Sequence, residues 1–367
     1  MRIVRLAMRN FRSYAAADVE LGPGVTVVTG RNGAGKTNLL DALYFGCTGR
    51  SSRTTNEREL VRFGERVVRV EMTTEAADGP HELSVGFTPG EPKRMTADGV
   101  RVERLLDVPG RPLVSVFLPD RLELIKGTPS LRRAHMDQLV TALWPARTAT
   151  RRAYNQALAQ RNALVARIRA GGASLDSLSA WDRELARHGI ALMADRRVAI
   201  EAVAERFAAR AEELGLDGEP AVAYRPRSKA ADAEGLAAEL AERVEGDLER
   251  GFTGHGPHRD DLAFRREGRE LRSYGSQGQQ RLGLLALLLA EREAIASTRE
   301  ATPVMLLDDV MSELDRDRRA RLVGLLRGRG QSVITTTDLE HVPGAGESDV
   351  LRLRVEDGAV RPEAEAA

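Results

Sequence analysis

The stretch Gly30-Arg31-Asn32-Gly33-Ala34-Gly35-Lys36-Thr37 decides the fold of this chain. It follows a β-type run at residues 25–29 and precedes an apolar helical segment at residues 38–45. The pattern is G-x-x-x-x-G-K-[ST], whose glycines let backbone N–H groups face phosphate oxygens at the positive end of the next helix. Strand, loop and helix in this order predict a phosphate-binding loop that holds a nucleoside triphosphate.

Two residues of the loop have further predicted roles. Lys36 would reach the β- and γ-phosphates, which makes it a catalytic candidate, and the Thr37 hydroxyl would bind Mg²⁺. We therefore expect ATP and Mg²⁺ as ligands. The candidate nucleotide-binding residues of the loop are Gly30, Arg31, Asn32, Gly33, Ala34, Gly35, Lys36 and Thr37.

Composition limits the class of protein. The 367 residues suffice for about two or three domains, and a hydrophobic content of 42% with only 4% aromatic residues predicts a sizeable aliphatic core. The sequence has no apolar run of about 18 residues, no signal-peptide pattern at the N-terminus and a single cysteine, Cys47. These features favour a bacterial-type cytoplasmic protein with no membrane partner. Because the formal net charge is only +1, DNA binding would need local basic clusters or a site assembled by two subunits.

The pattern of the chain changes twice. Strands are predicted before residue 125, at 2–6, 25–29, 67–72, 83–87 and 114–117, with turns at Asp78-Gly79, Pro89-Gly90 and Asp98-Gly99. From residue 128 to about 247 the pattern is helical. There it predicts an antiparallel helical hairpin with a glycine-rich tip at 170–174, too short for a long coiled coil and without a cysteine pair for a metal hook. Eight apolar residues would pack this hairpin, namely Tyr154, Leu158, Val165, Ile168, Leu178, Trp181, Leu185 and Leu192.

Strand character returns in the last third of the chain. Strands are predicted at 251–264, 303–307 and 332–336, helices at 277–298 and 316–327, and a frayed polar end at 357–367.

The buried strand at 303–307 ends in Asp308-Asp309. In a phosphate-loop enzyme the first carboxylate at such a strand end holds Mg²⁺, and the second can activate the attacking water. Asp308 is therefore the predicted metal residue and Asp309 the predicted catalytic base. Because Asp308 is so far from Lys36 in the sequence, we expect an α/β P-loop head split into two lobes by the helical arm. The predicted parts are an N-terminal lobe (1–127), the arm (128–247) and a C-terminal lobe (248–367).

Ser273 to Arg281 opens a predicted helix, with Ser276 and Gln279 at the positions of a capping box. Ser276-x-Gly278-Gln279 also resembles the signature motif of ABC-type ATPases, with Gln277 where glycine is usual. Met311–Asp315 resembles the loop after the acidic pair in that class. Thr335-Thr336-Thr337-Asp338 resembles its switch strand. The resemblance implies a split ABC-type head. It also implies that Ser276, Gly278, Gln279 and Thr337 contact ATP, and that a second copy of the chain completes each site in an ATP-dependent homodimer.

Further blocks, spread over nearly the whole chain, resemble the RecF family in the SMC-like branch of these ATPases. The family implies a weak DNA-dependent ATPase of recombinational repair that binds single-stranded, gapped and junction DNA. It also implies RecR and RecO as partners in loading RecA, roles in replication and SOS induction, and a nucleotide contact by Arg12. The blocks are Asn10–Tyr14, Gly49–Thr54, Phe117–Asp120, Lys126–Arg133 and Gly256–Asp261.

Two departures from the wider class favour slow turnover. Asp309 stands where glutamate is common, and its carboxylate is one methylene shorter, so it reaches the water less well. Thr337 stands where many members carry histidine, and a hydroxyl cannot carry a positive charge. We expect a switch that uses ATP to control how long the protein stays on DNA.

Three other functions stay open from the sequence: a transporter-type ABC subunit, a clamp with ATP as a static ligand, and a subunit of another SMC-like chromosome complex. His258 is expected to order a loop, because no second histidine or cysteine lies at ligand spacing. No single DNA contact is assigned. The arginines that could meet phosphates are Arg147, Arg151, Arg152, Arg161, Arg167 and Arg169 on the arm and Arg50, Arg53, Arg58 and Arg62 after the phosphate loop.

Overall fold

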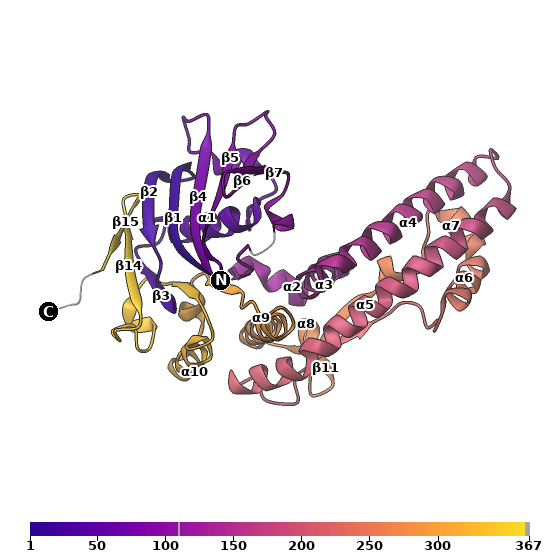
Figure 1. Cartoon of the computed structure of the whole chain (residues 1–367). Coiled ribbons are helices and arrows are strands. Elements are labelled where there is room, and N and C mark those ends of the chain that lie inside the picture. The colour runs from indigo at the N-terminus through magenta and orange to yellow at the C-terminus, as the bar shows by residue number, and fades with distance from the viewer. Residues whose placement is uncertain (109–110, 364–367) are drawn as a thin grey trace. The chain divides into compact units, whose positions relative to one another are not determined.

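The computed structural model describes residues 1–108 and 111–363, and its contacts divide the chain into two compact units. The head unit comprises Met1–Arg121 and Ile295–Ala367, and the arm unit comprises Leu122–Ala294 (Figure 1). The second boundary lies inside helix α9 (Gln277–Arg299), which belongs in part to each unit.

A mixed six-stranded sheet carries the phosphate loop in the head unit. Its order is β15-β14-β3-β13-β12-β8, and all neighbours are parallel except the antiparallel pair β14–β15. The inner strands are almost wholly buried, as their continuous apolar runs predict. The strands are β3 (Val25–Thr29), β8 (Val114–Phe117), β12 (Val304–Leu307), β13 (Ser332–Thr335), β14 (Leu351–Glu356) and β15 (Ala359–Pro362).

The second sheet of the head unit is antiparallel, in the order β2-β1-β4-β5-β6-β7. Helix α1 (Lys36–Thr48) contacts strands of both sheets, and its buried Leu39, Leu43 and Phe45 belong to one core with residues of each. Helix α10 (Arg316–Leu326) follows the acidic strand. The antiparallel strands are β1 (Arg2–Phe11), β2 (Tyr14–Glu20), β4 (Val68–Ala76), β5 (Gly79–Phe87), β6 (Arg94–Ala97) and β7 (Val100–Val102).

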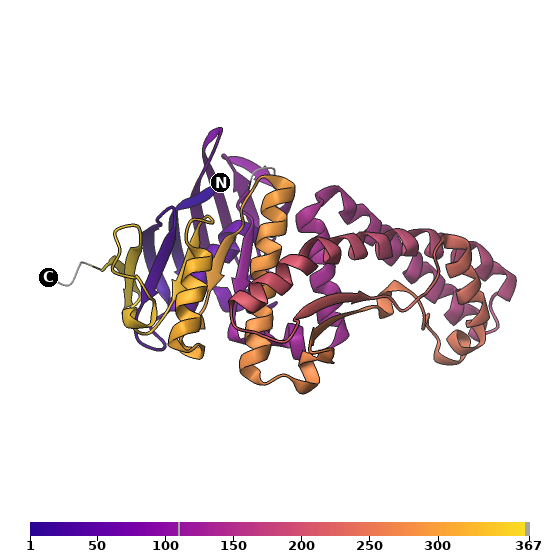
Figure 2. The ribbon, with the colours of Figure 1, turned by 90° about the horizontal axis from the view of Figure 1, so that it is seen from below.

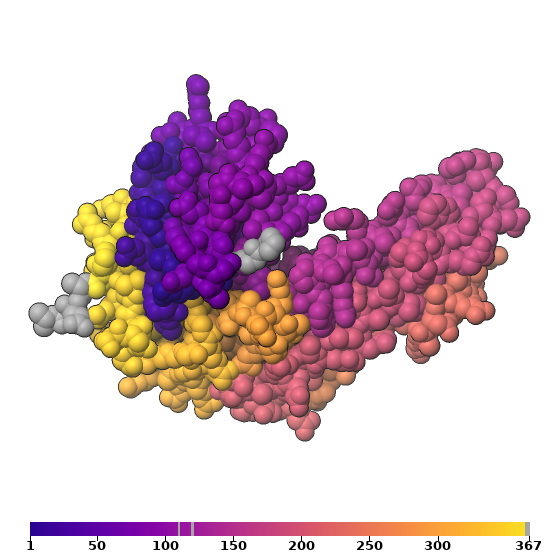
Figure 3. All heavy atoms as spheres, in the orientation of Figure 1, coloured from indigo at the N-terminus to yellow at the C-terminus, as the bar shows by residue number. Residues whose placement is uncertain are grey.

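The head unit therefore unites the two ends of the chain. Strand β3, from the N-terminal segment, pairs in parallel with β13 and β14 from the C-terminal segment. In the space-filling view the indigo N-terminal atoms and the yellow C-terminal atoms lie against each other (Figure 3). This confirms the prediction that one head is built from segments on either side of a helical insertion.

The arm unit contains the predicted helical hairpin. Helices α4 (Thr148–Arg169) and α5 (Leu178–Glu213) run side by side in Figures 1 and 2, and the glycine-rich segment 170–174 joins them. Of the eight predicted packing residues, Leu158, Ile168 and Trp181 are partly buried and the other five are buried. The other helices are α2 (Glu123–Lys126), α3 (Pro129–Leu143), α6 (Ala233–Glu242), α7 (Val244–Arg250) and α8 (Leu271–Tyr274).

The contacts divide the chain differently from the predicted three parts. Residue 247 lies inside α7, and residues 248–294 group with the arm helices. The physical reason is a small antiparallel sheet in the arm unit, in which β10 (Asp261–Arg266) pairs with β9 (Ala221–Arg225) and β11 (Arg269–Glu270). Strand β9 was missed because its five residues stand among helical patterns.

Two other expectations were wrong in detail. Of the predicted strand at 251–264, only the part from Asp261 is a strand, and the preceding residues form an ordered loop. The predicted frayed end contains β15, which pairs with β14, whereas residues 364–367 lie outside the described part of the chain. No helix within the described ranges is long and apolar enough to cross a membrane.

Candidate nucleotide-binding site

The phosphate loop lies between β3 and α1, and its glycines have backbone angles that other residues rarely adopt. Gly30, Gly33 and Gly35 have φ values of 152°, 82° and 117°. At Gly30 a side chain would also collide with the neighbouring strand, because its Cβ would lie 2.5 Å from the Val355 carbonyl oxygen. The Tyr14 hydroxyl supports the loop by donating a hydrogen bond to the Gly35 carbonyl oxygen at 3.0 Å.

Lys36 is buried at the first position of α1, and its side chain folds back over the loop. Its Nζ donates to the carbonyl oxygens of Gly30 at 2.7 Å and Arg31 at 3.1 Å. Burial lowers the pKa of the Lys36 ammonium group, and the carboxylates of Asp309 and Asp308 oppose this effect. The lysine and the acidic pair therefore share one electrostatic environment.

The structure brings Thr37 and Asp308 together. The Thr37 hydroxyl is 3.0 Å and 2.8 Å from the two carboxylate oxygens of Asp308. The hydroxyl of Thr335, the last residue of β13, donates to Asp308 Oδ1 at 2.8 Å. Parallel strands β12 and β13 are neighbours, so their carboxyl ends place these groups beside the phosphate loop.

Asp309 has an unusual backbone and an unsatisfied side chain. Its φ of 46° is in the left-handed region, and its N–H donates to the Thr335 hydroxyl at 3.0 Å. Its Oδ1 is buried and has no hydrogen-bond partner among the described atoms. A non-glycine residue in this conformation costs about 1–3 kcal/mol, and such strain gathers at functional sites. A strained carboxylate with a spare acceptor atom suits a residue that orients a water.

Thr335 is a site residue that the sequence reasoning missed. The resemblance to ABC-type ATPases predicts a switch strand at Thr335–Asp338, with Thr337 as its functional threonine. In the structure Thr335 is buried against the acidic pair, whereas Thr337 lies beyond the strand and is exposed. Every residue of β13 is buried, so the sequence gives no alternation that singles out Thr335, and it does not show where the strand ends. A contact between Thr337 and the γ-phosphate stays a prediction.

Arg12 lies beside α1, held by Asp41. Its guanidinium group is 2.7 Å from the fully buried carboxylate of Asp41 and also donates to the Ser51 hydroxyl at 3.3 Å. Ser51 and Ser52 hydrogen-bond the same carboxylate at 2.9 Å. Two of the sequence blocks thus meet at the first helix of the site through Asp41, which the sequence analysis did not single out. A contact of Arg12 with nucleotide stays a prediction.

The predicted capping box is confirmed in the arm unit. The Ser276 backbone N–H donates to Gln279 Oε1 at 2.8 Å, and the Gln279 N–H donates to the Ser276 hydroxyl at 3.3 Å. Ser276 is exposed, and a Cβ at Gly278 would meet only the Ser276 hydroxyl, at 3.9 Å. This is the N-terminus of a 23-residue helix, where backbone N–H groups can receive an anion. A contact with ATP by Ser276, Gly278 and Gln279 stays a prediction.

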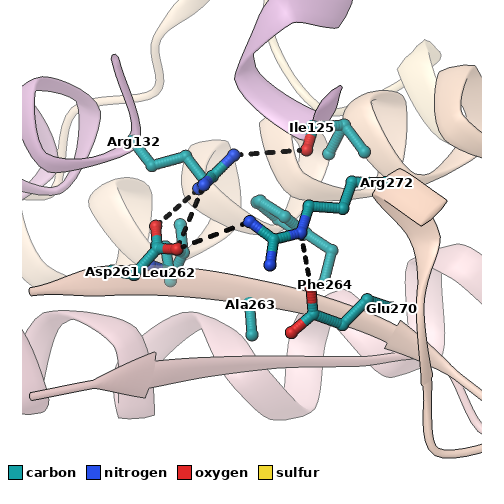
Figure 4. Close-up of a pocket in the computed structure, with 8 residues that line it drawn as sticks. All are labelled: Ile125, Arg132, Asp261, Leu262, Ala263, Phe264, Glu270 and Arg272. Atoms are coloured by element: carbon teal, nitrogen blue, oxygen red, sulfur yellow. Dashed lines mark hydrogen bonds and ion pairs between the residues drawn. The ribbon is translucent and has the colours of Figure 1, made fainter. Parts of the chain in front are cut away.

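Two more of the sequence blocks meet in a small pocket of the arm unit (Figure 4). The buried guanidinium of Arg132 forms a bidentate pair with Asp261, with distances of 2.6 Å and 3.0 Å, and donates to the Gly127 carbonyl oxygen at 2.8 Å. Arg272 approaches the same carboxylate at 3.9 Å. The Arg132–Asp261 ion pair occupies this pocket and joins α3 to the start of β10. We therefore assign the residues that line the pocket a structural role in the arm unit.

His258 orders a loop, as the sequence predicts. Its Nε2 is 2.9 Å from the Thr253 carbonyl oxygen and therefore donates a proton to it, which leaves Nδ1 to accept from the Tyr154 hydroxyl at 2.7 Å. Burial lowers the pKa of His258 to about 4. No cluster of three or more histidine, cysteine or acidic residues that could hold a metal occurs in the described part of the chain.

This histidine should make stability depend on pH. The unfolded chain has a histidine pKa near 6.5, so between about pH 4 and 6.5 it binds more protons than the folded chain, and stability falls as the pH falls. Between pH 7 and pH 5 the His258 contribution should drop by about 2 kcal/mol. Urea unfolding of wild type and His258→Asn over this range should show a shallower pH dependence in the variant. Equal slopes would contradict the assignment.

The structure removes one arginine from the DNA candidates. Arg161 is fully buried and pairs with Asp182 at 2.6 Å and Asp247 at 2.7 Å, so it cannot meet a phosphate. Arg147 and Arg151 are 3.0 Å and 3.2 Å from aspartates but keep partly exposed side chains. Arg62 is partly buried, and the exposed candidates are Arg50, Arg53, Arg58, Arg151, Arg152, Arg167 and Arg169.

Fold and site together define a class. A P-loop that shares its sheet with an acidic strand end, in a head interrupted by a helical insertion, is an ATPase head of the ABC type. Residues 5–103 match a family model described as "AAA domain". The solved Smc head bound to the C-winged helix domain of ScpA has the same fold, with a TM-score of 0.59 and 17% identity over 99% of this chain and 98% of that one.

More similar proteins identify the family. The "DNA replication and repair protein RecF" of Myxococcus xanthus is 38% identical over 379 residues, which cover 100% of this chain and 98% of that protein. A solved structure of the recombination mediator protein RecF with ATP, described as part of the RecFOR pathway, has a TM-score of 0.86 and 29% identity over 99% of this chain and 98% of that one. The chain belongs to the RecF family of DNA replication and repair proteins.

Proposed function

We propose that the chain is an ATP-controlled DNA-binding protein of recombinational repair that hydrolyses ATP slowly. The observation that carries this proposal is the meeting of Lys36, Thr37 and the Asp308-Asp309 pair in one site. The similar RecF structure was solved with ATP, which supports ATP as the nucleotide here.

The residues present fit Mg²⁺. The Thr37 hydroxyl and the Asp308 carboxylate are hard oxygen ligands in direct contact, and Mg²⁺ in nucleotide sites takes few protein ligands beside phosphate oxygens. When bound, the ion would neutralise charge on the phosphates. Thr335 would hold the Asp308 carboxylate in place through its hydrogen bond.

The remaining roles follow from position. The Lys36 ammonium group now bonds carbonyl oxygens of the phosphate loop. Because the phosphates of ATP would bind at the same loop, Lys36 would give up these bonds and bind the phosphates instead. Asp309 would orient and deprotonate the attacking water with its unpaired Oδ1. Its short side chain is a reason to expect weak turnover, and membership of the RecF family is the reason to expect that DNA stimulates it.

We further propose that ATP brings two copies together, with Ser276, Gly278 and Gln279 of one completing the site of the other. The dimer would bind single-stranded, gapped and junction DNA in the cytoplasm and act with RecR and RecO to help load RecA. Family membership and the exposed capped helix support this arrangement.

DNA binding with and without ATP tests the proposal. ATP should tighten wild-type binding to single-stranded, gapped or duplex DNA by about 5- to 150-fold, the usual range of coupling between two sites. Lys36→Arg should lose this effect, because the forked guanidinium cannot replace the compact ammonium group in the loop. Fluorescence anisotropy over a salt series measures both affinity and its salt dependence.

The control is Lys229→Arg, an exposed lysine of the arm unit, which should behave as wild type. Log affinity should fall linearly with log salt by about 0.9 for each phosphate neutralised on duplex DNA. Equal wild-type affinity with and without ATP would reject control by ATP, and a flat salt response would reject contacts to phosphates.

A further inference from the structure

The head unit presents one aromatic side chain wholly to solvent. Phe63 is fully exposed, unlike the other phenylalanines of that unit, Phe11, Phe45, Phe87 and Phe117, which are buried. It lies in the segment 61–67, here called the Phe63 loop, between the phosphate-loop region and β4. Single exposed apolar residues are normal on protein surfaces, but the loop that carries Phe63 is built in a way that holds the ring in solvent.

The Phe63 loop is bonded to strand β1 before the phenylalanine and is closed by a turn after it. The Arg62 N–H donates to the Asn10 carbonyl oxygen at 2.8 Å, and Val61 forms a β-bridge with Phe11. The Glu65 N–H donates to the Arg62 carbonyl oxygen at 3.0 Å, which closes a turn around Phe63 and Gly64. Gly64 has a φ of 86° and permits this turn. The ring is therefore held out by a hydrogen-bonded turn.

Arginines lie in this loop and at the adjoining positions of the sheet. Arg62 and Arg66 flank Phe63 in the sequence, and Arg9 on β1 lies directly opposite Arg69 on β4, next to the loop. Like charges opposite each other on neighbouring strands destabilise a sheet unless an anion offsets them. Arg69 pairs with Glu71 at 2.6 Å, and Glu65 accepts from the Asn10 amide at 3.2 Å. Within the described residues, Arg9, Arg62 and Arg66 have no ion-pair partner.

We propose that Phe63 stacks on an unpaired base of a DNA strand, while Arg9, Arg62 and Arg66 contact the neighbouring phosphates. The inference deepens the proposed function and rests on it, because it assumes that the protein binds DNA. A rigid ring with cationic neighbours suits a nucleic acid strand, which offers π faces beside regular negative charges. A duplex covers its base faces except at ends and junctions, so the ring acts where bases are unpaired.

The test compares Phe63→Ala with wild type in the presence of ATP. Single-stranded and gapped DNA should bind about 5- to 150-fold more weakly to the variant, the range for losing one base–aromatic stack. Circular duplex DNA without a gap should bind within about twofold of wild type, because it offers no free base face. The salt slope of the variant should equal that of wild type. Arg66→Ala should make the slope of log affinity against log salt shallower by about 0.7 to 0.9, the contribution of one neutralised phosphate.

Two further variants complete the design. Val100→Ala removes another exposed apolar side chain from the same antiparallel sheet and should bind every DNA as wild type does. Phe63→Trp should keep the affinity for gapped DNA, and single-stranded DNA should quench its tryptophan fluorescence more than that of wild type, which has only Trp144 and Trp181.

Several results would overturn the inference while leaving DNA binding intact. These are unchanged affinity of Phe63→Ala for gapped DNA, an equal loss on gap-free duplex, and no quenching of Phe63→Trp beyond that of wild type. Loss of ATP-dependent dimerisation in Phe63→Ala would assign the ring to a contact between two copies and would also overturn it. If wild type binds no DNA, it is the proposed function itself that fails.

Discussion

Replacing Asp309 with asparagine should lower ATP hydrolysis by about 10²- to 10⁴-fold, the usual contribution of a general base. The amide keeps the size of the side chain but cannot take a proton from water. The N–H of residue 309 can still donate to the Thr335 hydroxyl, so the backbone should keep its conformation. ATP binding depends on the phosphate loop and should remain, and the ATP-bound dimer should therefore persist longer than in wild type.

Steady-state phosphate release measures the first effect, and size-exclusion chromatography after dilution into ATP-free buffer measures the second. Asp317→Asn is a matched control, because Asp317 is an exposed aspartate in the first turn of α10 and should leave both values unchanged. A normal rate of hydrolysis in Asp309→Asn would exclude Asp309 as the base. Slow hydrolysis with an unchanged dimer lifetime would favour a clamp in which ATP is a static ligand.

Replacing Arg161 with alanine should destabilise the arm unit by about 3–5 kcal/mol, the cost of leaving buried charges without their partner. The carboxylates of Asp182 and Asp247 are 6% and 0% exposed, and both are hydrogen-bonded by Arg161. Arg161 also donates to the Thr253 hydroxyl at 2.8 Å and so connects the hairpin to the 251–260 loop. The Arg161 Nη2 has no partner among the described atoms. The ion pairs of Arg161 with Asp182 and Asp247 therefore add little net stability, although losing Arg161 would leave both buried carboxylates without their partner.

Urea unfolding followed by far-ultraviolet circular dichroism measures this effect, because helices dominate the arm unit. Arg167→Ala, on the exposed face of the same helix, should change stability by less than about 0.5 kcal/mol. A loss below about 1 kcal/mol in Arg161→Ala would mean that the two carboxylates find water or other partners. If Arg161→Ala instead weakened DNA binding with stability unchanged, Arg161 would again be a candidate for contact with DNA phosphates.

Local sequence patterns predicted much of the head. The glycines of the phosphate loop were predictable without knowledge of the tertiary structure. The backbone angles of Gly30 and Gly35 favour glycine, and this requirement belongs to the loop itself. The acidic pair was predictable because a short apolar run ending in two carboxylates indicates a buried parallel strand. The capping box of Ser276 and Gln279 is likewise a contact between residues three apart.

Contacts between distant residues could not be predicted in the same way. Thr335 rather than Thr337 meets Asp308 because β13 ends at Thr335, and its end depends on pairing with β3 and β12. Arg161 and Arg167 look alike in the sequence, yet one is buried and the other exposed. In the folded arm unit Arg161 faces α5, α7 and the 251–260 loop, whereas Arg167 faces solvent.

By itself, the sequence determined the P-loop, its following helix, the acidic strand end, the helical hairpin and the resemblance to the RecF family, because each is a local pattern of residue types. Only the tertiary structure decided which side chains complete the site and which arginines are buried in the arm unit. The tertiary structure also showed that Phe63 is exposed on a hydrogen-bonded turn, with Arg66 in the same loop and Arg9 on the adjoining strand. The physical reason is that backbone angles and caps act between neighbours in the chain, whereas burial and pairing depend on the whole fold.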